Sequence, residues 1–453
     1  MRLFKNQYYI VYLIMFLLFI SHYFTEIEIL GHLTIWVALF AIFISWFAAA
    51  KIFKVVSAAF IVVALILGLS SGQTFASLYQ YTLSNIPLVM FFSMMPWISV
   101  IFRIGGMKAS LTQTIQDKNN YMPNIYLKTF LNSGFLSVFL NISGTYIVQN
   151  IIIRLFSNEN IHTRNDIIAT ATGRAFAVMM MSAPLELIVV ISIDYTGVGY
   201  LTMLPWLFII SFIGFLTEII YSRKAYRDVK VDLPYTEIDN KMLIQSLIKM
   251  FIILVVFVAI VILVSQNTDL SFIFTIGLAL FPFSFVTSAL LGFAWAFLKE
   301  GVIAWKHHNN HLQNFVVLFI PLGIFSGAFS NSALPDVMQS VLSNIGGTMI
   351  VIFIVAAVFI GGMSLLGVHS VASVAIIYDV LLPVIDEASL LSFIIVVVAA
   401  GVGTTAYSPY STVANVTVQN INISPYFLLR KNKWFAVRMM VIAIIVATIL
   451  LYI

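Results

Sequence analysis

The chain has 453 residues, of which 61% are hydrophobic and only 9% are charged. An ordinary soluble domain carries about 25% charged residues, so this composition excludes a soluble enzyme, a nucleic-acid-binding protein and a disordered scaffold. The net charge of +5 is small, and the lack of cysteine excludes disulfides and thiolate metal sites. The composition is typical of a polytopic membrane protein.

Apolar stretches long enough to span a bilayer follow one another along the chain, without the alternating pattern of barrel strands. The first carries no small-residue cleavage pattern, so we interpret it as a span rather than a signal peptide. Spans are predicted at residues 8–23, 33–49, 55–70, 86–102, 200–221, 247–264, 270–297, 315–329 and 437–453, broken pairs at 125–156 and 349–382, and interrupted spans at 167–193 and 390–418.

The basic residues indicate the orientation of these spans. None of the 23 Lys and Arg residues lies in the predicted outer loops, which are residues 25–31, 71–85, 194–199, 266–269, 332–348 and 383–389. Lys and Arg are concentrated in cytoplasmic loops of membrane proteins. We therefore expect a multi-pass protein of the cytoplasmic membrane, with the N-terminus inside and the C-terminus outside.

Two parts of the chain resemble each other. Residues 86–92 have an echo at 320–325, and residues 139–155 lie in register with 365–381 at an offset that also places Ser182 on Ser408. The orientation count makes the two copies opposite in direction, which is typical of secondary transporters. The division that follows is N-terminal helices at 1–80, a first inverted repeat at 81–221, a cytoplasmic loop at 222–246, linking helices and an interfacial stretch at 247–312, a second repeat at 313–425 and a last helix at 426–453.

Each copy contains a hairpin with a polar tip and a helix interrupted by Ser and Pro. Pro184 and Pro409 each remove a backbone donor inside an apolar run. Irregular backbone at membrane depth is tolerated beside a cavity or inside protein, and the ends of half-helices can bind anions or cations. The alternative is a pair of proline kinks that are repacked by Ser and Thr and bind nothing.

This pattern resembles the ion transporter superfamily, which includes divalent-anion/sodium symporters, arsenite and NhaD-type antiporters, and the large permease subunits of TRAP transporters. The resemblance rests on the order of hairpin and broken helix, on the lead-in at residues 173–176 and on the two Ser/Pro interruptions. It implies an all-α membrane fold with two inverted-topology repeats, each with a re-entrant hairpin and an interrupted helix. The Ser-Asn-Thr signatures of the dicarboxylate symporters are missing from the hairpin tips, so no single branch lends its substrate.

Two charged residues lie inside the predicted interrupted helix. Arg174 suits a bidentate carboxylate or phosphate, and the alternative is that its side chain extends toward the cytoplasmic interface. Glu186 is either a proton or sodium ligand or a local support for the interruption, because a carboxylate at this depth costs about 2.5–3.5 kcal/mol on insertion scales.

The remaining candidates are uncharged oxygen and nitrogen donors at the tips and breaks, each of which alone is more often a packing residue. With Arg174, the predicted substrate contacts are Asn141, Ser143, Ser182, His369, Ser370, Thr404, Thr405, Ser408 and Ser411, and Thr412 joins Glu186 as a coupling-ion residue.

Other polar residues are predicted to be structural. We expect His307, His308 and His311 to lie in a solvated cytoplasmic loop, and Asp379 to lie near the outer interface. We find no Ser-His-Asp, zinc-ligand or nucleotide-loop pattern in the sequence, so we expect neither catalysis nor a metal or organic cofactor.

Together these features predict a secondary active transporter for a small solute, such as an organic carboxylate, coupled to Na⁺ or H⁺. The alternatives are a Na⁺/H⁺-type antiporter that depends on Glu186 and a flippase for lipid or cell-wall intermediates. The expected partners are a small-molecule or ion substrate and the bilayer, without nucleic acid, and a homodimer is left open.

Overall fold

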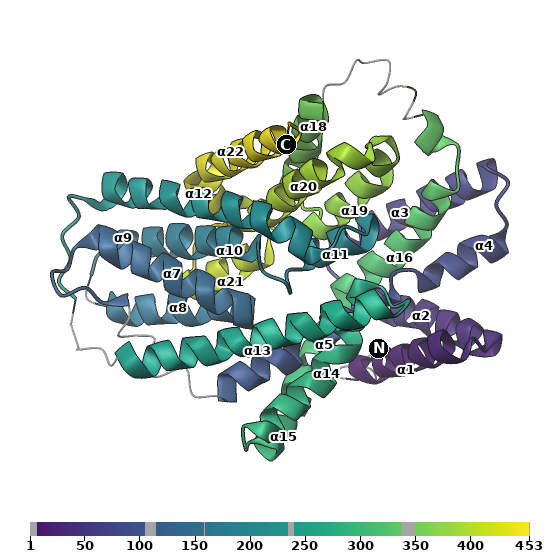
Figure 1. Ribbon diagram of the computed structural model, residues 1–453, viewed down its shortest axis with the longest axis horizontal. Coiled ribbons are helices and arrows are strands. Elements are labelled where there is room, and N and C mark those ends of the chain that lie inside the picture. Colours follow the sequence, from purple (N-terminus) through teal and green to yellow (C-terminus); the bar gives the residue numbers. More distant parts are fainter. Residues whose placement is uncertain are drawn as a thin grey trace. The chain divides into compact units, whose positions relative to one another are not determined.

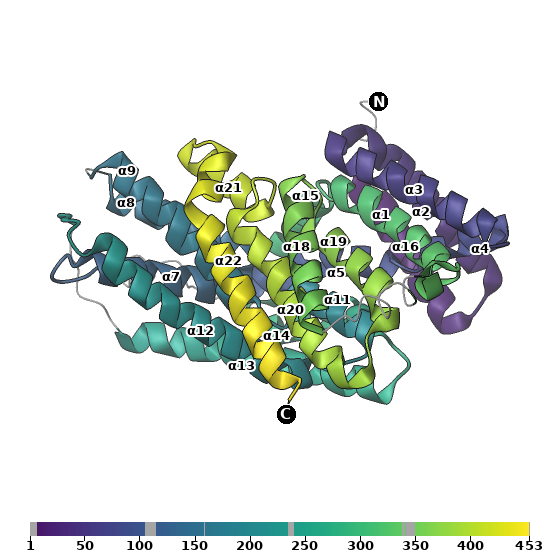
Figure 2. The same ribbon diagram turned by 90° about the horizontal axis from the view of Figure 1, so that it is seen from above.

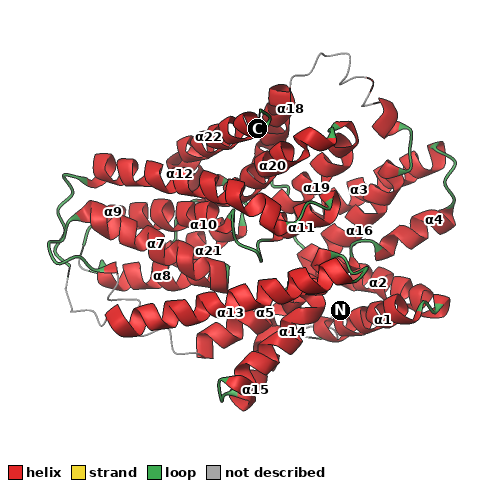
Figure 3. Ribbon diagram, viewed as in Figure 1, coloured by secondary structure: helices red, strands yellow, loops and turns green. Residues whose placement is uncertain are grey.

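The computed structural model describes residues 7–104, 115–157, 159–233, 240–337, 340 and 349–452. Within these residues every regular element is a helix (Figure 3). In chain order they are α1 (Tyr8–Thr25), α2 (Glu28–Ala48), α3 (Lys51–Ser70), α4 (Phe75–Gln80), the 3₁₀ turn η2 (Tyr81–Leu83), α5 (Ile86–Ile104), α7 (Met122–Leu140), α8 (Ile142–Leu155), α9 (Ile161–Ile167), the π-helical turn η3 (Ile168–Thr172), α10 (Gly173–Met180), α11 (Leu187–Thr196), α12 (Tyr200–Tyr226), α13 (Asn240–Asn267), α14 (Phe272–Leu290), α15 (Ala294–Asn309), α16 (Gln313–Ser330), α18 (Met349–Leu365), α19 (Ser370–Leu381), the 3₁₀ turn η4 (Leu382–Val384), α20 (Glu387–Tyr407), α21 (Thr412–Ile421) and α22 (Pro425–Leu450).

The described residues contain ten segments that are long and apolar enough to cross a membrane. This confirms the predicted all-α polytopic membrane protein. The two predicted hairpins and the two predicted interruptions fall where helices end and begin again, at residues 141, 366–369, 181–186 and 408–411. The inverted relation between the two copies stays a prediction.

The chain forms two compact units, each assembled from three segments. Unit 1 contains Met1–Ile101, Ala259–Gly346 and Tyr378–Val384, and unit 2 contains Phe102–Val258, Gly347–Ile377 and Ile385–Ile453. Helices α1, α2, α3 and α16 pack together in unit 1. The ring of Phe92 on α5 stacks on Phe315 and Phe319 of α16, so that an aromatic seam joins these two helices.

Unit 1 shows how α15 supports a proline inside α5. Pro96 has no N–H, so the carbonyl of Phe92 one turn earlier loses its helical donor. The His308 Nε2 atom lies 2.9 Å from that carbonyl oxygen and replaces the missing donor. The prediction of a solvated loop is therefore wrong for His307 and His308, which lie in the last turn of helix α15, and His308 is only partly exposed. His311 lies in the turn that follows and is exposed.

Some helix ends differ from the predicted spans. The span predicted at 270–297 ends instead at Leu290, because Gly292 takes the left-handed conformation (φ = 80°) and the Phe293 N–H donates to the Ser288 carbonyl. Helix α22 begins at Pro425, next to the start of the last helix predicted at 426–453 and twelve residues before the apolar span predicted at 437–453, and its basic residues Lys431 and Arg438 pair with Asp166 and Glu218. Parts of the predicted loops at 222–246 and 332–348 lie outside the described residues.

Helix α20 forms the centre of unit 2. It packs against α10, α11, α12, α18, α21 and α22, and every residue from 392 to 404 is buried. Helices α20 and α22 run beside each other (Figure 2). A helix that is apolar on all sides has its natural place in the interior of a bundle.

The hairpin of α7 and α8 is the second main feature of unit 2 (Figure 1). Its turn is a single residue, Asn141, which takes a positive φ of 52°. Gly144 allows the two helices to approach closely, because a Cβ atom there would fall 2.5 Å from the carbonyl of Leu136. The hairpin packs on α10 through α7 and on α21 through α8, and this places it beside both interrupted helices.

Candidate functional site

The first interruption separates α10 from α11. Pro184 cannot donate a hydrogen bond, and the chain crosses residues 181–186 through two short turns, Ala183 N–H to Met180 O and Glu186 N–H to Ala183 O. Carbonyl groups freed by the break are bound from α12. The Ser211 hydroxyl donates to Val178 O at 2.8 Å, and the Tyr200 hydroxyl donates to Ser182 O at 2.7 Å.

The second interruption lies between α20 and α21. The Ser411 hydroxyl donates to Thr405 O at 2.9 Å and accepts the Ala414 N–H at 3.0 Å, so Ser411 is the N-cap of α21. The Ser408 hydroxyl donates to Ser364 O, the carbonyl of a residue in the last turn of α18. Thr404 and Thr405 donate to carbonyls of their own helix. The predicted residues of this break are therefore brought together, and each hydroxyl donates to a backbone carbonyl.

The two hairpin tips differ in their exposure. At the first tip, the Asn141 side chain accepts the Ile142 N–H at 2.7 Å and caps α8, while Ser143 is exposed. At the second tip, Gly367 takes a positive φ of 92° and His369 Nδ1 accepts the Val371 N–H at 3.4 Å. His369 and Ser370 are half-buried. The tips combine helix-capping groups with polar groups that reach the surface.

Glu186 is a buried carboxylate at the N-terminus of α11, with 7% of its surface exposed. A negative charge at this end of a helix is favourable. Among the residues that the structure describes, no basic side chain forms an ion pair with Glu186. Thr412, the other predicted coupling-ion residue, is half-buried as the first residue of α21.

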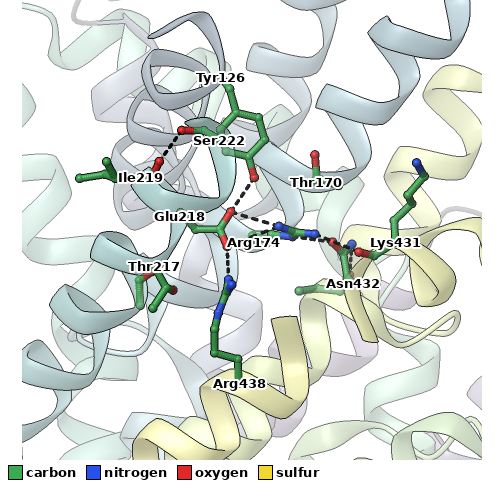
Figure 4. A network of polar contacts seen from close by, with 12 residues as sticks. Tyr126, Thr170, Arg174, Thr217, Glu218, Ile219, Ser222, Lys431, Asn432 and Arg438 are labelled. Atoms are coloured by element: carbon green, nitrogen blue, oxygen red, sulfur yellow. Dashed lines mark hydrogen bonds and ion pairs between the residues drawn. The ribbon is translucent and has the colours of Figure 1, made fainter. Parts of the chain in front are cut away.

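Arg174 lies in a buried polar network of unit 2 (Figure 4). The Arg174 Nη1 atom donates to both carboxylate oxygens of Glu218, at 3.2 and 3.4 Å. The Nη2 atom donates to the Lys431 carbonyl at 2.9 Å. Its Nε donates to the Asn432 side chain at 2.8 Å, and its carbon Cζ lies 4.1 Å from the ring centre of Tyr221. Arg174 thus has protein partners for its charge and for each of its three nitrogens.

Glu218 is the centre of this network and is fully buried. Besides Arg174, it accepts a hydrogen bond from the Tyr126 hydroxyl at 2.6 Å and pairs with Arg438. The charge-assisted bonds satisfy both carboxylate oxygens. Glu218 was missed in the sequence, although an acidic residue inside the apolar run at 200–221 is itself a signal for a functional or structural site.

Two buried amides were also missed, Asn432 on α22 and Gln149 on α8. The Asn432 amide donates to Ala169 O in the π-turn at 3.0 Å and to Ala406 O near the end of α20 at 2.8 Å. The Gln149 amide donates to Thr172 at 3.0 Å and to Thr417 at 2.8 Å. No periodic pattern marks such residues, because their partners lie more than 20 residues away in sequence.

The chain is similar to a known protein in fold but matches none in sequence. No family model and no curated protein matches the sequence. The crystal structure of the Alcanivorax borkumensis YdaH transporter is similar in fold, with a TM-score of 0.60 and 12% sequence identity over 87% of this chain and 98% of that chain. The chain therefore has a fold that is also found in a membrane transporter.

Proposed function

We propose that the protein is a secondary active transporter that moves a small organic anion, such as a carboxylate, across the cytoplasmic membrane. Transport would be coupled to a Na⁺ or H⁺ gradient. The fold that it shares with a transporter supports this proposal. So does the presence of two interrupted helices in one unit, because half-helix ends at membrane depth are the usual ion and substrate ligands of secondary transporters.

The observation that carries the proposal is the contrast between the two half-helices that follow the interruptions. Helix α11 begins with the carboxylate of Glu186, which offsets its positive end, whereas α21 begins with the uncharged Ser411 and Thr412. The positive end of α21 is therefore better suited to an anion, and Glu186 to a cation or proton. Glu186 keeps the role of coupling-ion residue in this proposal, and the uncharged tip and break residues keep that of substrate contacts. Thr412, predicted as a coupling-ion residue, lies at the positive end of α21 and joins the proposed substrate contacts.

Arg174 receives a different role. Its charge is met by Glu218 and each of its nitrogens already donates to protein atoms, so a substrate carboxylate would have to displace a buried ion pair. We assign Arg174 to the support of the site rather than to direct substrate binding.

A Na⁺/H⁺-type antiporter is the second candidate, and one observation favours it. Glu186 is buried without a basic partner among the described residues, which suits a carboxylate that exchanges one cation for another. In that case Glu186 would itself be the transport site.

One reconstitution experiment separates the two candidates. Purified protein in proteoliposomes is given ¹⁴C-labelled succinate, citrate or glutamate, with an inward Na⁺ gradient, an inward H⁺ gradient or none, while a pH dye reports internal pH. Gradient-driven accumulation of a labelled anion supports the symporter. A pH change that depends on Na⁺, without accumulation of any anion, overturns it in favour of the antiporter.

Binding gives an independent measure of the same proposal. A ligand at 100 times its dissociation constant stabilises the folded state by about 2.7 kcal/mol. We expect one of these carboxylates to raise the melting temperature of the purified protein, and to raise it further with its coupling ion present.

A further inference from the structure

Two buried amide side chains join the first interrupted helix to the second. Asn432 reaches the π-turn η3 and the end of α20, and Gln149 reaches the same π-turn and α21. Both side chains are fully buried. The π-turn is therefore held to both halves of the other interrupted helix, by residues from two further helices.

Each carbonyl that Asn432 binds has lost its ordinary helical donor. In the π-turn the ladder is out of register, and the Gly173 N–H donates to Thr170 O. At the end of α20, the Tyr410 N–H, which would continue the helix to Ala406 O, donates instead to the Ser408 hydroxyl. A buried carbonyl without a partner is costly, so these two groups need the donors that Asn432 supplies.

Arg174 fixes the orientation of the Asn432 amide. The two N–H groups of Asn432 face carbonyl oxygens, and its oxygen faces the Arg174 Nε at 2.8 Å. Only one of the two flipped orientations satisfies this arrangement, because Arg174 cannot accept and a carbonyl cannot donate. The Glu218 carboxylate and the Lys431 carbonyl hold the guanidinium in place (Figure 4).

We infer that Asn432, oriented by Arg174, is a positioning residue that keeps the π-turn of the first interrupted helix in a fixed register with the interruption of the second, with Gln149 as a second tie. The inference rests on the proposed function insofar as the interruptions form the transport site. It gives a role to a permanently charged side chain six residues before the end of α10, whose hydrogen bonds within the described residues go to Asn432, Glu218 and Lys431.

The test uses four variants. Asn432→Ala removes the donors and the acceptor, Asn432→Asp keeps the acceptor for Arg174 but loses both donors, and Arg174→Lys keeps a charge for Glu218 but loses the planar fork. Gln149→Ala removes the second tie and serves if the Asn432 variants do not fold. The matched control is Asn150→Ala, because within the described part of the chain the Asn150 amide donates to the Tyr146 carbonyl, one turn earlier on the same helix.

Hydrogen–deuterium exchange measures the effect of these buried hydrogen bonds on backbone stability, and it needs no substrate. We expect Asn432→Ala and Asn432→Asp to speed exchange by about tenfold in two peptides together, residues 166–176 and 404–412, as the loss of a buried hydrogen bond predicts. Arg174→Lys acts in the same direction, and Asn150→Ala changes neither peptide. Faster exchange in only one peptide, or the same change in the control, overturns the inference.

Transport kinetics then test whether the tie positions the site. A merely structural role lowers the amount of active protein and therefore Vmax, whereas a positioning role raises the KM for the ¹⁴C-labelled anion that the wild type accumulates. Unchanged KM in Asn432→Asp, despite faster exchange in both peptides, overturns the positioning role. If the wild type accumulates none of the three anions, the proposed function fails, and the exchange experiment still decides whether the π-turn is joined to the second interruption.

Discussion

Glu218 and Glu186 are both buried carboxylates of unit 2, yet their surroundings differ in kind. Glu218 binds two arginines and a tyrosine, and removing such a partner from a buried pair costs about 3–5 kcal/mol. Glu186 lies beside a helix break and, among the described residues, has no ion-pair partner. The charge of Glu218 is already neutralised by two arginines, so binding a cation there would require an ion pair to break. Glu186 is therefore the better candidate for a residue that binds and releases an ion.

Replacing Glu186 by Gln tests this difference. We expect Glu186→Gln to fold and to lower gradient-driven accumulation of the transported anion by about 5- to 150-fold, the span of typical coupling free energies. Its KM for the anion should change little, since the substrate contacts are elsewhere. Uptake in proteoliposomes measures both quantities, with Glu387→Gln as the control because Glu387 is an exposed acid in the first turn of α20. Full coupling in Glu186→Gln would contradict the assignment.

His308 gives a pH-dependent contribution to stability. Burial, the largest cause, lowers its pKa from 6.5 to about 4, although the contact with Phe92 O works in the opposite direction. Between these two pH values the unfolded chain binds a proton that the folded protein does not. The contribution is therefore complete above pH 6.5 and is lost as the pH falls toward 4, by at most about 1.4 kcal/mol per pH unit.

Thermal melts of wild type and His308→Gln between pH 4 and 7.5 check this expectation. Gln keeps an N–H donor for the Phe92 carbonyl but does not titrate, so its melting temperature should depend less on pH in this window. Identical pH profiles for the two proteins would show that His308 is not the responsible group.

At the scale of elements, the close packing of α7 on α8 depends on a glycine, Gly144. Gly144→Ala places a methyl group against the backbone of Leu136 and Ser137, which cannot move aside as a flexible side chain can. We expect a loss of about 1–3 kcal/mol in stability, typical of overpacking. The matched control is Gly362→Ala on α18, where nothing lies within 4 Å and the better helix propensity of Ala should raise stability by up to about 1 kcal/mol. Melting temperatures that move in the same direction for both variants would contradict the close approach.

Elements of this protein could be predicted where a local property determines them. Hydropathy locates the spans because the bilayer sets their length, and Pro184 and Pro409 locate the breaks because proline cannot complete a helix. The π-turn before Arg174 and the contact of His308 with α5 were not predicted, although α15 itself lies within the predicted interfacial stretch. Both involve distant partners, Asn432 for the π-turn and the Phe92 carbonyl for His308.

The location of the candidate site could be predicted from the sequence, but its hydrogen bonds and ion pairs could not. The sequence places Ser408, Ser411 and Thr405 at one break, where the structure also has them together. It could not indicate that Arg174 is matched by Glu218, because the two residues belong to different spans and a charge in one span says nothing about the rotation of the next. Whether these residues bind a substrate stays a prediction.

For the whole molecule, the distribution of Lys and Arg predicts the orientation in the membrane. The chain contains no cysteine, so a single introduced cysteine is a unique label. We expect Ala76→Cys, on the exposed face of α4, to react with a membrane-impermeant maleimide in intact cells, and Asp228→Cys, just after α12, to react only after permeabilisation. The reverse result would invert the predicted orientation of the spans.

The division of each unit among three stretches of chain has a consequence for biosynthesis. The Arg174 side chain and the Ala169 carbonyl leave the ribosome long before Asn432, which follows Arg174 by 258 residues. At 5–20 residues per second, this leaves them without their final partner for roughly 10–50 s. During that interval the segment that becomes the π-turn lacks the donor that Asn432 supplies, and an unsatisfied carbonyl is costly in a membrane environment. We therefore expect insertion of this chain to need protection of this polar backbone until the last helix is made, and a chain shortened before α22 to be degraded faster than the full chain in a pulse–chase measurement.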